Sequence, residues 1–289
     1  MAAPATLLAS ALGPAALLPA ALLPPAAPPP SAPAGTVVVL HAHPDDEAIF
    51  TGATLRALAD RGARVVVVTA TSGEEGVPRA PLGRGESLAQ RRLAELERAC
   101  ELLGVARLVL LGYADSGAHA GPWAPGSLGA AAPGEVAARV ADVVEQEAAD
   151  ALVHYDRRGI YGHVDHVQVH RAGALAARRT GVTAYEATVD ADRLRRGPRH
   201  VLQQAAGDEL DAAGESPSAI DVTVDVTAGP DPSALLAKMA AMAAHASQIG
   251  PQWLDHAGFA AAYGREWFVR RGPAGPLDTL ARDLARLPA

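Results

Sequence analysis

Two clusters of histidine and aspartate hold most of the reactive side chains in this sequence. The first is His41-Ala-His43-Pro-Asp45-Asp46-Glu47, and the second lies within residues 156–170. Imidazole nitrogens and carboxylate oxygens are the side-chain atoms that bind zinc and similar divalent cations. The two clusters therefore predict one centre for a divalent metal, provided that the fold brings them together.

Three side chains are candidate ligands for this metal. His43 and Asp46 flank the turn at Pro44, which would bring both side chains to one side. His166 would join them from the second cluster, where it shares a helical face with His163. Two imidazoles and one carboxylate leave coordination positions open for water and substrate. The alternative is that the carboxylates of residues 45–47 only cap a helix N-terminus.

Other functions are disfavoured by the loop chemistry and the composition. A dinucleotide-binding loop needs glycines and bare amides, whereas the carboxylates of Asp45, Asp46 and Glu47 would repel a pyrophosphate. The formal net charge of −7 argues against general nucleic-acid binding. Cys100 is the single cysteine, so a disulfide framework and a cysteine metal site are excluded.

The segments around the clusters follow a β-α-β-α-β-α-β pattern. Apolar runs rich in valine predict buried strands, and helical periodicity between them predicts connecting helices. This alternation is typical of a Rossmann-like α/β fold, an open and mostly parallel sheet flanked by helices. Ligands bind at the carboxyl ends of such strands, where both clusters are expected. The predicted strands are 36–40, 64–70, 107–111 and 151–155, and the predicted helices are 48–59, 86–104, 134–149 and one that begins near residue 163.

The C-terminal part is expected to add a strand–helix extension to this sheet. Strands are predicted at 183–189, 220–226 and 266–270, and a helix at 232–249. Residues 190–214 are expected to form a polar, irregular or partly helical excursion. A short helical tail is predicted from Gly272.

Residues 1–34 differ in composition from the rest of the chain. They contain no charged side chain and are mostly Ala, Leu and Pro, which predicts a disordered extension. Prolines interrupt every stretch long enough for a membrane helix, so no stable membrane span is expected. The positive segment of a secretory signal is missing, which favours a cytoplasmic location, with an atypical signal peptide as the alternative. We therefore expect one domain over residues 35–272 and a short tail over 273–289.

Taken in order, the motifs resemble those of the LmbE-like or PIG-L family of metal-dependent N-acetylglucosaminyl deacetylases. The resemblance rests on His43-Pro-Asp-Asp-Glu47 after one strand and on Gly162-His163-Val-Asp165-His166 after another. Val164 stands where the family usually has proline, a change that removes no chemical group. Four shorter motifs support the resemblance and extend it over residues 36–271: Thr69-x-x-x-Gly73-Glu-Glu-Gly76, Arg92-x-x-Glu95, Asp115-Ser-Gly117 and His245-x-Ser247-Gln248.

The resemblance implies roles for the metal ligands and for a base. His43, Asp46 and His166 would hold Zn²⁺, or Fe²⁺, which fits the same ligands. Such a metal acidifies a water molecule and polarises an amide carbonyl. Asp45 would act as general base for that water and would then return the proton to the leaving amine.

The resemblance also implies residues that contact the substrate. His163 would stabilise the developing oxyanion, with Asp165 orienting the imidazole, and Tyr161 would add a second donor. Arg92 and Asp115 are candidates for holding sugar hydroxyls. A solvated helix charge and a turn-forming aspartate stay open as alternative interpretations of these last two residues.

The function that the resemblance implies is that of a zinc-dependent hydrolase. It would remove an acetyl group from an N-acetylglucosamine-type small molecule. One alternative is an amidase that cleaves a thiol-conjugate amide with the same metal site. Another is a non-catalytic metal- or sugar-binding protein, although a pure binding site gains nothing from the unligated carboxylate of Asp45. The expected partner is thus a small-molecule amino sugar and not a nucleic acid, and formation of a homo-oligomer stays open.

Overall fold

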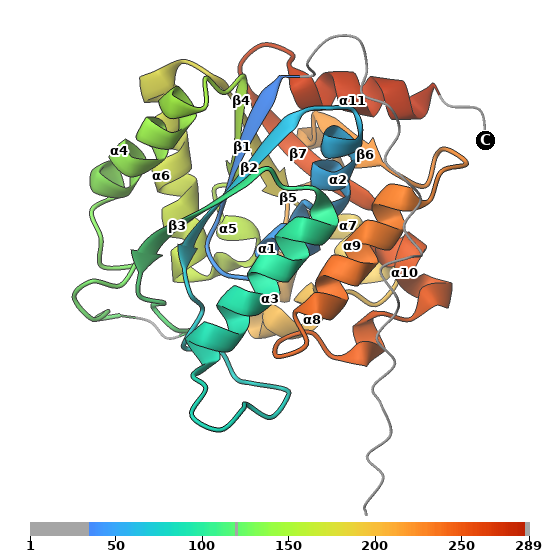
Figure 1. Ribbon diagram of the computed structural model, residues 1–289. Helices are drawn as coiled ribbons and strands as arrows, with labels where there is room; N and C mark the ends of the chain where they lie inside the picture. The colour runs from blue at the N-terminus through green and yellow to red at the C-terminus, as the bar shows by residue number, and fades with distance from the viewer. Residues whose placement is uncertain (1–34, 119–120, 287–289) are drawn as a thin grey trace, which may run out of the picture.

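A sheet of seven strands organises the part of the protein that the structure describes (Figure 1). The computed structural model describes residues 35–118 and 121–286, so the alanine- and proline-rich segment 1–34 lies outside the described residues. The strand order is β3-β2-β1-β4-β5-β7-β6. β7 is antiparallel to both of its neighbours and the other pairs are parallel, which confirms the predicted mostly parallel sheet. The strands are β1 (Thr36–His41), β2 (Arg64–Thr71), β3 (Arg107–Tyr113), β4 (Ala151–Tyr155), β5 (Thr183–Thr188), β6 (Val222–Asp225) and β7 (Arg265–Arg271).

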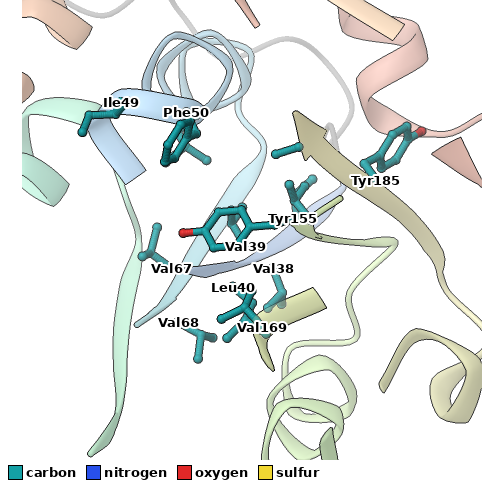
Figure 2. Close-up of a cluster of buried hydrophobic side chains, with 14 of the residues drawn as sticks. Val38, Val39, Leu40, Ile49, Phe50, Val67, Val68, Tyr155, Val169 and Tyr185 are labelled. Carbon is teal, nitrogen blue, oxygen red and sulfur yellow. The ribbon is translucent and has the colours of Figure 1, made fainter. Parts of the chain in front are cut away.

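The central strands are buried because both of their faces carry apolar side chains. Residues 37–40 of β1 and 65–68 of β2 are all fully buried, as expected for valine-rich strands covered by helices on both sides. Figure 2 shows Val38, Val39, Val67 and Val68 in one cluster with Tyr155 and Phe50. Val37 to Val39 pair in parallel with residues 151–153 of β4, so β1 and β4 end side by side.

Helices cover both faces of the sheet (Figure 1). α4 (Pro133–Gln146) and α6 (Val164–Thr180) pack together on one face, and α2 (Gly52–Asp60), α3 (Leu88–Leu103) and α9 (Ser233–Ala244) pack on the other. No helix within residues 35–118 and 121–286 is long and apolar enough to cross a membrane. The remaining helices are α1 (Asp46–Phe50), α5 (Gly159–Gly162), α7 (Ala191–Arg196), α8 (Leu202–Ala205), α10 (His256–Tyr263) and α11 (Pro276–Ala285), with 3-10 turns at 207–212, 217–219 and 251–253.

Two predicted helices are shorter in the structure because tertiary contacts interrupt them. The helix expected after the first cluster breaks at Thr51, whose φ of −134° separates α1 from α2. The Thr51 hydroxyl donates to the carbonyl of Glu47 at 3.1 Å and contacts Nε2 of His41 at 2.9 Å. The helix expected over 232–249 ends at Ala244, because His245 leaves the helical path and its side chain contacts the buried carboxylate of Glu47.

The C-terminal strand β7 is tied to the first helices of the chain by a buried carboxylate. Glu266 accepts hydrogen bonds from the backbone N–H groups of Ala53 and Thr54, at 2.9 and 2.8 Å, in the first turn of α2. The same carboxylate pairs with the ammonium of Lys238 on α9 at 2.6 Å, and both side chains are buried. Glu266 therefore joins β7, α2 and α9 at one point.

Candidate active site

The two clusters meet at the carboxyl ends of β1 and β4, as the parallel sheet requires. A pocket of about 330 Å³ opens above them, a volume within the range of small-molecule sites. Segments from the second half of the chain complete its wall. The residues that line the pocket include His43, Asp45, Asp46, Phe50, Arg92, Asp115, Tyr161, His163, Leu202 and Gln248.

Three donor atoms at the floor of the pocket form a nearly regular triangle. Nδ1 of His43 lies 3.3 Å from Nε2 of His166 and 3.6 Å from Oδ2 of Asp46, and the last two atoms are 3.4 Å apart. Ligands bound tetrahedrally to zinc at about 2.0–2.2 Å stand roughly 3.4 Å from one another. The spacing of this set therefore fits one divalent cation.

The other nitrogen of the His43 ring faces carboxylates. Nε2 lies 3.2 Å from Oδ2 of Asp165 and 3.5 Å from Oδ1 of Asp115. The Asp165 carboxylate also accepts hydrogen bonds from the backbone N–H and the hydroxyl of Ser116. The expected contact between this carboxylate and the imidazole of His163 is thus replaced by one with His43. Histidines that bind metals are commonly held in this way through the second nitrogen.

The local electrostatics favour a positive charge at the pocket floor. Burial lowers the pKa of His43, yet the surrounding carboxylates raise it well above its usual value. Burial raises the pKa of Asp46, but the imidazoles of His166 and His43 hold it well below its usual value.

Two other sets of side chains also place their donor atoms within 4.8 Å of one another and compete as cation sites. They are His43 with His163 and His166, and His43 with Asp115 and Asp165.

His166 is held by aromatic packing. Its ring stacks on Tyr155 with centroids 4.5 Å apart, and the ring of Tyr161 meets it edge-on at 4.8 Å. Within the residues that the structure describes, Nδ1 of His166 has no hydrogen-bond partner. Gly159 permits this packing, because it has a φ of +59° and a Cβ there would lie 2.6 Å from Cβ of His166.

Asp45 stands beside the triangle in a backbone conformation that side chains rarely adopt. Its φ is 116°, and although it precedes the first residue of α1, its carboxylate makes no capping hydrogen bond within the described chain. The carboxylate instead lies 3.2 Å from the guanidinium of Arg92. Burial raises the pKa of Asp45 to about 6, although Arg92 opposes the shift. The interpretation of Asp45 as a simple helix cap is therefore wrong.

Arg92 and Asp115 both line the pocket, but each is committed to loop backbone. Arg92 is only 4% exposed and donates to the carbonyls of Gly73, at 2.9 Å, and Pro44, at 2.5 Å. A solvated helix charge is thus excluded for Arg92. Asp115 accepts hydrogen bonds from the N–H groups of Gly117 and Glu75, so the turn-forming role is present alongside its contact with His43. A Cβ at Gly73 would lie 2.5 Å from the guanidinium carbon, so glycine is required there.

His163 both starts a helix and faces the pocket. Its Nδ1 accepts the backbone N–H of Asp165 at 3.2 Å and so caps α6. Burial lowers the pKa of His163 to about 4, helped by the neighbouring imidazole of His43. Because Nδ1 is the acceptor in this arrangement, the neutral ring carries its proton on Nε2 and can donate it to a ligand.

A second layer of contacts was not predicted from the sequence. Oε1 of Glu47 lies 2.6 Å from Nε2 of His245, and both side chains are fully buried. Ser247 donates from its hydroxyl and its backbone N–H to the carboxylate of Glu95, at 2.6 and 3.0 Å. In the sequence, the Arg92-x-x-Glu95 and His245-x-Ser247-Gln248 motifs mark these residues. The motifs do not indicate which residues contact one another.

Comparison with known proteins identifies the family of the chain. Residues 38–177 match the family described as GlcNAc-PI de-N-acetylase, PIG-L. The chain is 38% identical over 247 residues to the 1D-myo-inositol 2-acetamido-2-deoxy-alpha-D-glucopyranoside deacetylase of Kineococcus radiotolerans, covering 74% of this chain and 68% of the relative. It is 35% identical over 266 residues to the enzyme of the same name from Acidothermus cellulolyticus, covering 83% and 90% of the two chains.

Solved structures share the fold at lower identity. The N,N'-diacetylchitobiose deacetylase of Pyrococcus horikoshii aligns with a TM-score of 0.54 and 21% identity, over 82% of this chain and 84% of its own. A deacetylase from the teicoplanin biosynthesis pathway aligns with a TM-score of 0.55 and 20% identity, over 83% and 100% of the two chains. At these identities the likeness shows a common α/β architecture.

Proposed function

Because the chain belongs to the PIG-L family, described as GlcNAc-PI de-N-acetylase, we propose that it is a metal-dependent hydrolase that deacetylates an N-acetylglucosamine-type small molecule. The observation that carries the proposal is the triangle of donor atoms from His43, Asp46 and His166 at the floor of a pocket of substrate size. The names of the curated relatives support an amino-sugar substrate.

The three donors would hold Zn²⁺, and Fe²⁺ fits the same two imidazoles and one carboxylate. We favour this set over the trio with His163, because Nδ1 of His163 accepts a backbone N–H and the ring proton then lies on Nε2, so that neither nitrogen offers a free lone pair to a metal. When bound, the metal supplies Lewis acidity toward a carbonyl oxygen and lowers the pKa of water.

Asp45 is the proposed general base. Its carboxylate lies outside the donor triangle, is held by Arg92 and faces the pocket. A pKa of about 6 keeps the carboxylate largely ionised at neutral pH, and it is close enough to neutrality for efficient proton transfer. Asp45 would accept a proton from the attacking water and pass it to the amine as the amide C–N bond breaks.

The remaining pocket residues would orient the amide and the sugar. His163, neutral and protonated at Nε2, would donate to the developing oxyanion, and Tyr161 would add a second donor from the same wall. Arg92 and Asp115 would contact sugar hydroxyls with the donors and lone pairs that the loops leave free. Asp165 would orient His43 through their 3.2 Å contact.

The test measures acetate and free amine released by the metal-loaded protein. We expect equal amounts of both from at least one amino sugar, and far less from Asp45→Asn at equal metal content. Amine release without acetate would identify an amidase, and metal uptake without any turnover would identify a binding protein. The substrate panel is the N-acetylglucosaminyl inositol for which the relatives are named, diacetylchitobiose, free N-acetylglucosamine and a thiol-conjugate amide.

A further inference from the structure

We propose that the buried His245–Glu47 pair is a positioning device that holds Asp45 in its working conformation. The inference rests on the proposed function, since it takes Asp45 to be the proton acceptor. Neither His245 nor Glu47 lines the pocket, so the pair would act through Asp45 and not on the substrate.

One carboxylate links His245 to the backbone of Asp45. Oε1 of Glu47 lies 2.6 Å from Nε2 of His245, while Oε2 accepts the backbone N–H of Asp45 at 3.0 Å. Both side chains of the pair are fully buried. In a buried environment such a charge-assisted contact is short and directional, so moving the imidazole would move the carboxylate and with it the Asp45 amide.

The conformation of Asp45 needs an external constraint. A φ of 116° is rare for any residue other than glycine, and it persists only where the surroundings enforce it. Glu47 supplies the acceptor for the Asp45 N–H, and the Asp45 carboxylate is then free to face Arg92 and the pocket. The hydrogen bond from the Asp45 N–H to Glu47 thus holds the Asp45 backbone at positive φ and leaves the Asp45 carboxylate free to face the pocket.

Helix α3 anchors both ends of this arrangement. Arg92 reaches the Asp45 carboxylate at 3.2 Å. One turn later, Glu95 holds Ser247 through two hydrogen bonds, which fixes the chain immediately after His245. The carboxylate of Asp45 is thus held directly by α3, and its backbone is held indirectly through residues 245–247 and Glu47.

The test compares two substitutions of His245 whose amide side chains differ in length. In His245→Gln the side-chain nitrogen can occupy the place of Nε2, whereas the asparagine side chain of His245→Asn is too short to reach Glu47. We expect both variants to keep the wild-type metal content and a KM within about twofold of wild type. His245→Asn should lose roughly 10- to 100-fold in kcat, because small misplacements of a reacting group cost about that much. His245→Gln should recover most of that rate.

A double-mutant cycle shows whether the effect passes through Asp45. In an Asp45→Asn background, His245→Asn should cause no further loss of kcat, since the group that it positions is already disabled. An equal loss in both backgrounds, equal rates for the two amides, or loss of metal in His245→Asn would each overturn the inference. If the wild type releases no acetate from any panel substrate, the proposed function itself fails. This result is distinct from failure of the inference, because turnover by the wild type is measured before the variants are compared with it.

Discussion

Tyr155 stacks on the imidazole of His166, with ring centroids 4.5 Å apart and planes inclined by 21°. The hydroxyl of Tyr155 accepts the backbone N–H of Ala42 at 3.2 Å and contacts Nδ1 of His41 at 3.0 Å. One side chain from β4 therefore fixes both the end of β1 and the direction of the His166 ring on α6. The donor atoms are positioned by packing before any cation is bound.

His166→Ala should remove one of three metal ligands. We expect the purified variant to contain far less metal than the wild type by elemental analysis, and to lose turnover in parallel. His170→Ala is the matched control, because His170 lies one turn later on α6 and outside the donor triangle. Full metal content in His166→Ala would show that the competing set without His166, namely His43, Asp115 and Asp165, holds the ion.

Asp45 and Asp46 are adjacent, but their amide variants should fail in different ways. Asp46→Asn replaces an anionic donor with a neutral one, so metal affinity should fall. Asp45→Asn should keep the metal and lose about 10²–10⁴-fold in kcat, the usual contribution of a general base. Metal content and kcat measured on the same preparations decide the matter. Metal loss in Asp45→Asn with retention in Asp46→Asn would exchange the two roles.

The backbone at Asp45 makes a separate prediction about stability. Asp45→Gly should be more stable than Asp45→Ala by about 1–2 kcal/mol, because only glycine adopts positive φ without a penalty. Denaturant unfolding at neutral pH measures the difference. The control is Ala94→Gly at an exposed position within α3, where the same exchange should destabilise by about 1 kcal/mol. Equal stability of the two Asp45 variants would contradict the strain described above.

Two histidines away from the pocket floor should make the fold sensitive to acid. Burial lowers the pKa of His154 and of His200 to about 3, so the folded state binds their protons less readily than the unfolded state, where the pKa is near 6.5. Stability from these groups is complete above pH 6.5 and is lost as the pH falls toward 3. At pH 5 the loss is about 2 kcal/mol for each histidine.

His200→Asn tests this dependence. Nδ1 of His200 accepts the N–H of Leu202 at 3.1 Å, and an asparagine oxygen can take its place without titrating. The drop in unfolding free energy between pH 7 and pH 5, measured in urea, should shrink by about 2 kcal/mol in the variant. An unchanged drop would mean that His200 is not protonated on unfolding in this range.

The sequence was sufficient for those parts of the site that depend on strand ends. Apolar runs identified β1 and β4, and the rule for parallel sheets placed residues 43–46 and 163–166 at one edge. The Glu47–His245 contact could not be predicted, since its partners are 198 positions apart and no local pattern relates them. The breaks at Thr51 and Ala244 were missed for the same reason, because side chains from elsewhere end those helices. The contact between Asp165 and His43 was not predicted either. The Asp165 carboxylate is also held by Ser116, which lies in a loop whose sequence has no periodicity.

The carboxylate of Glu266 has a consequence for how this protein could be recombined with its relatives. It lies in β7, far beyond residues 38–177 that match the family description, yet it accepts the first free amides of α2 and pairs with Lys238. Excising the matched segment would leave those amides buried without their acceptor. A breakpoint placed between α6 and β7 would also separate interdependent pieces. A functional chimera must therefore keep the Glu266 carboxylate together with Lys238, and residues with a free backbone N–H at positions 53 and 54.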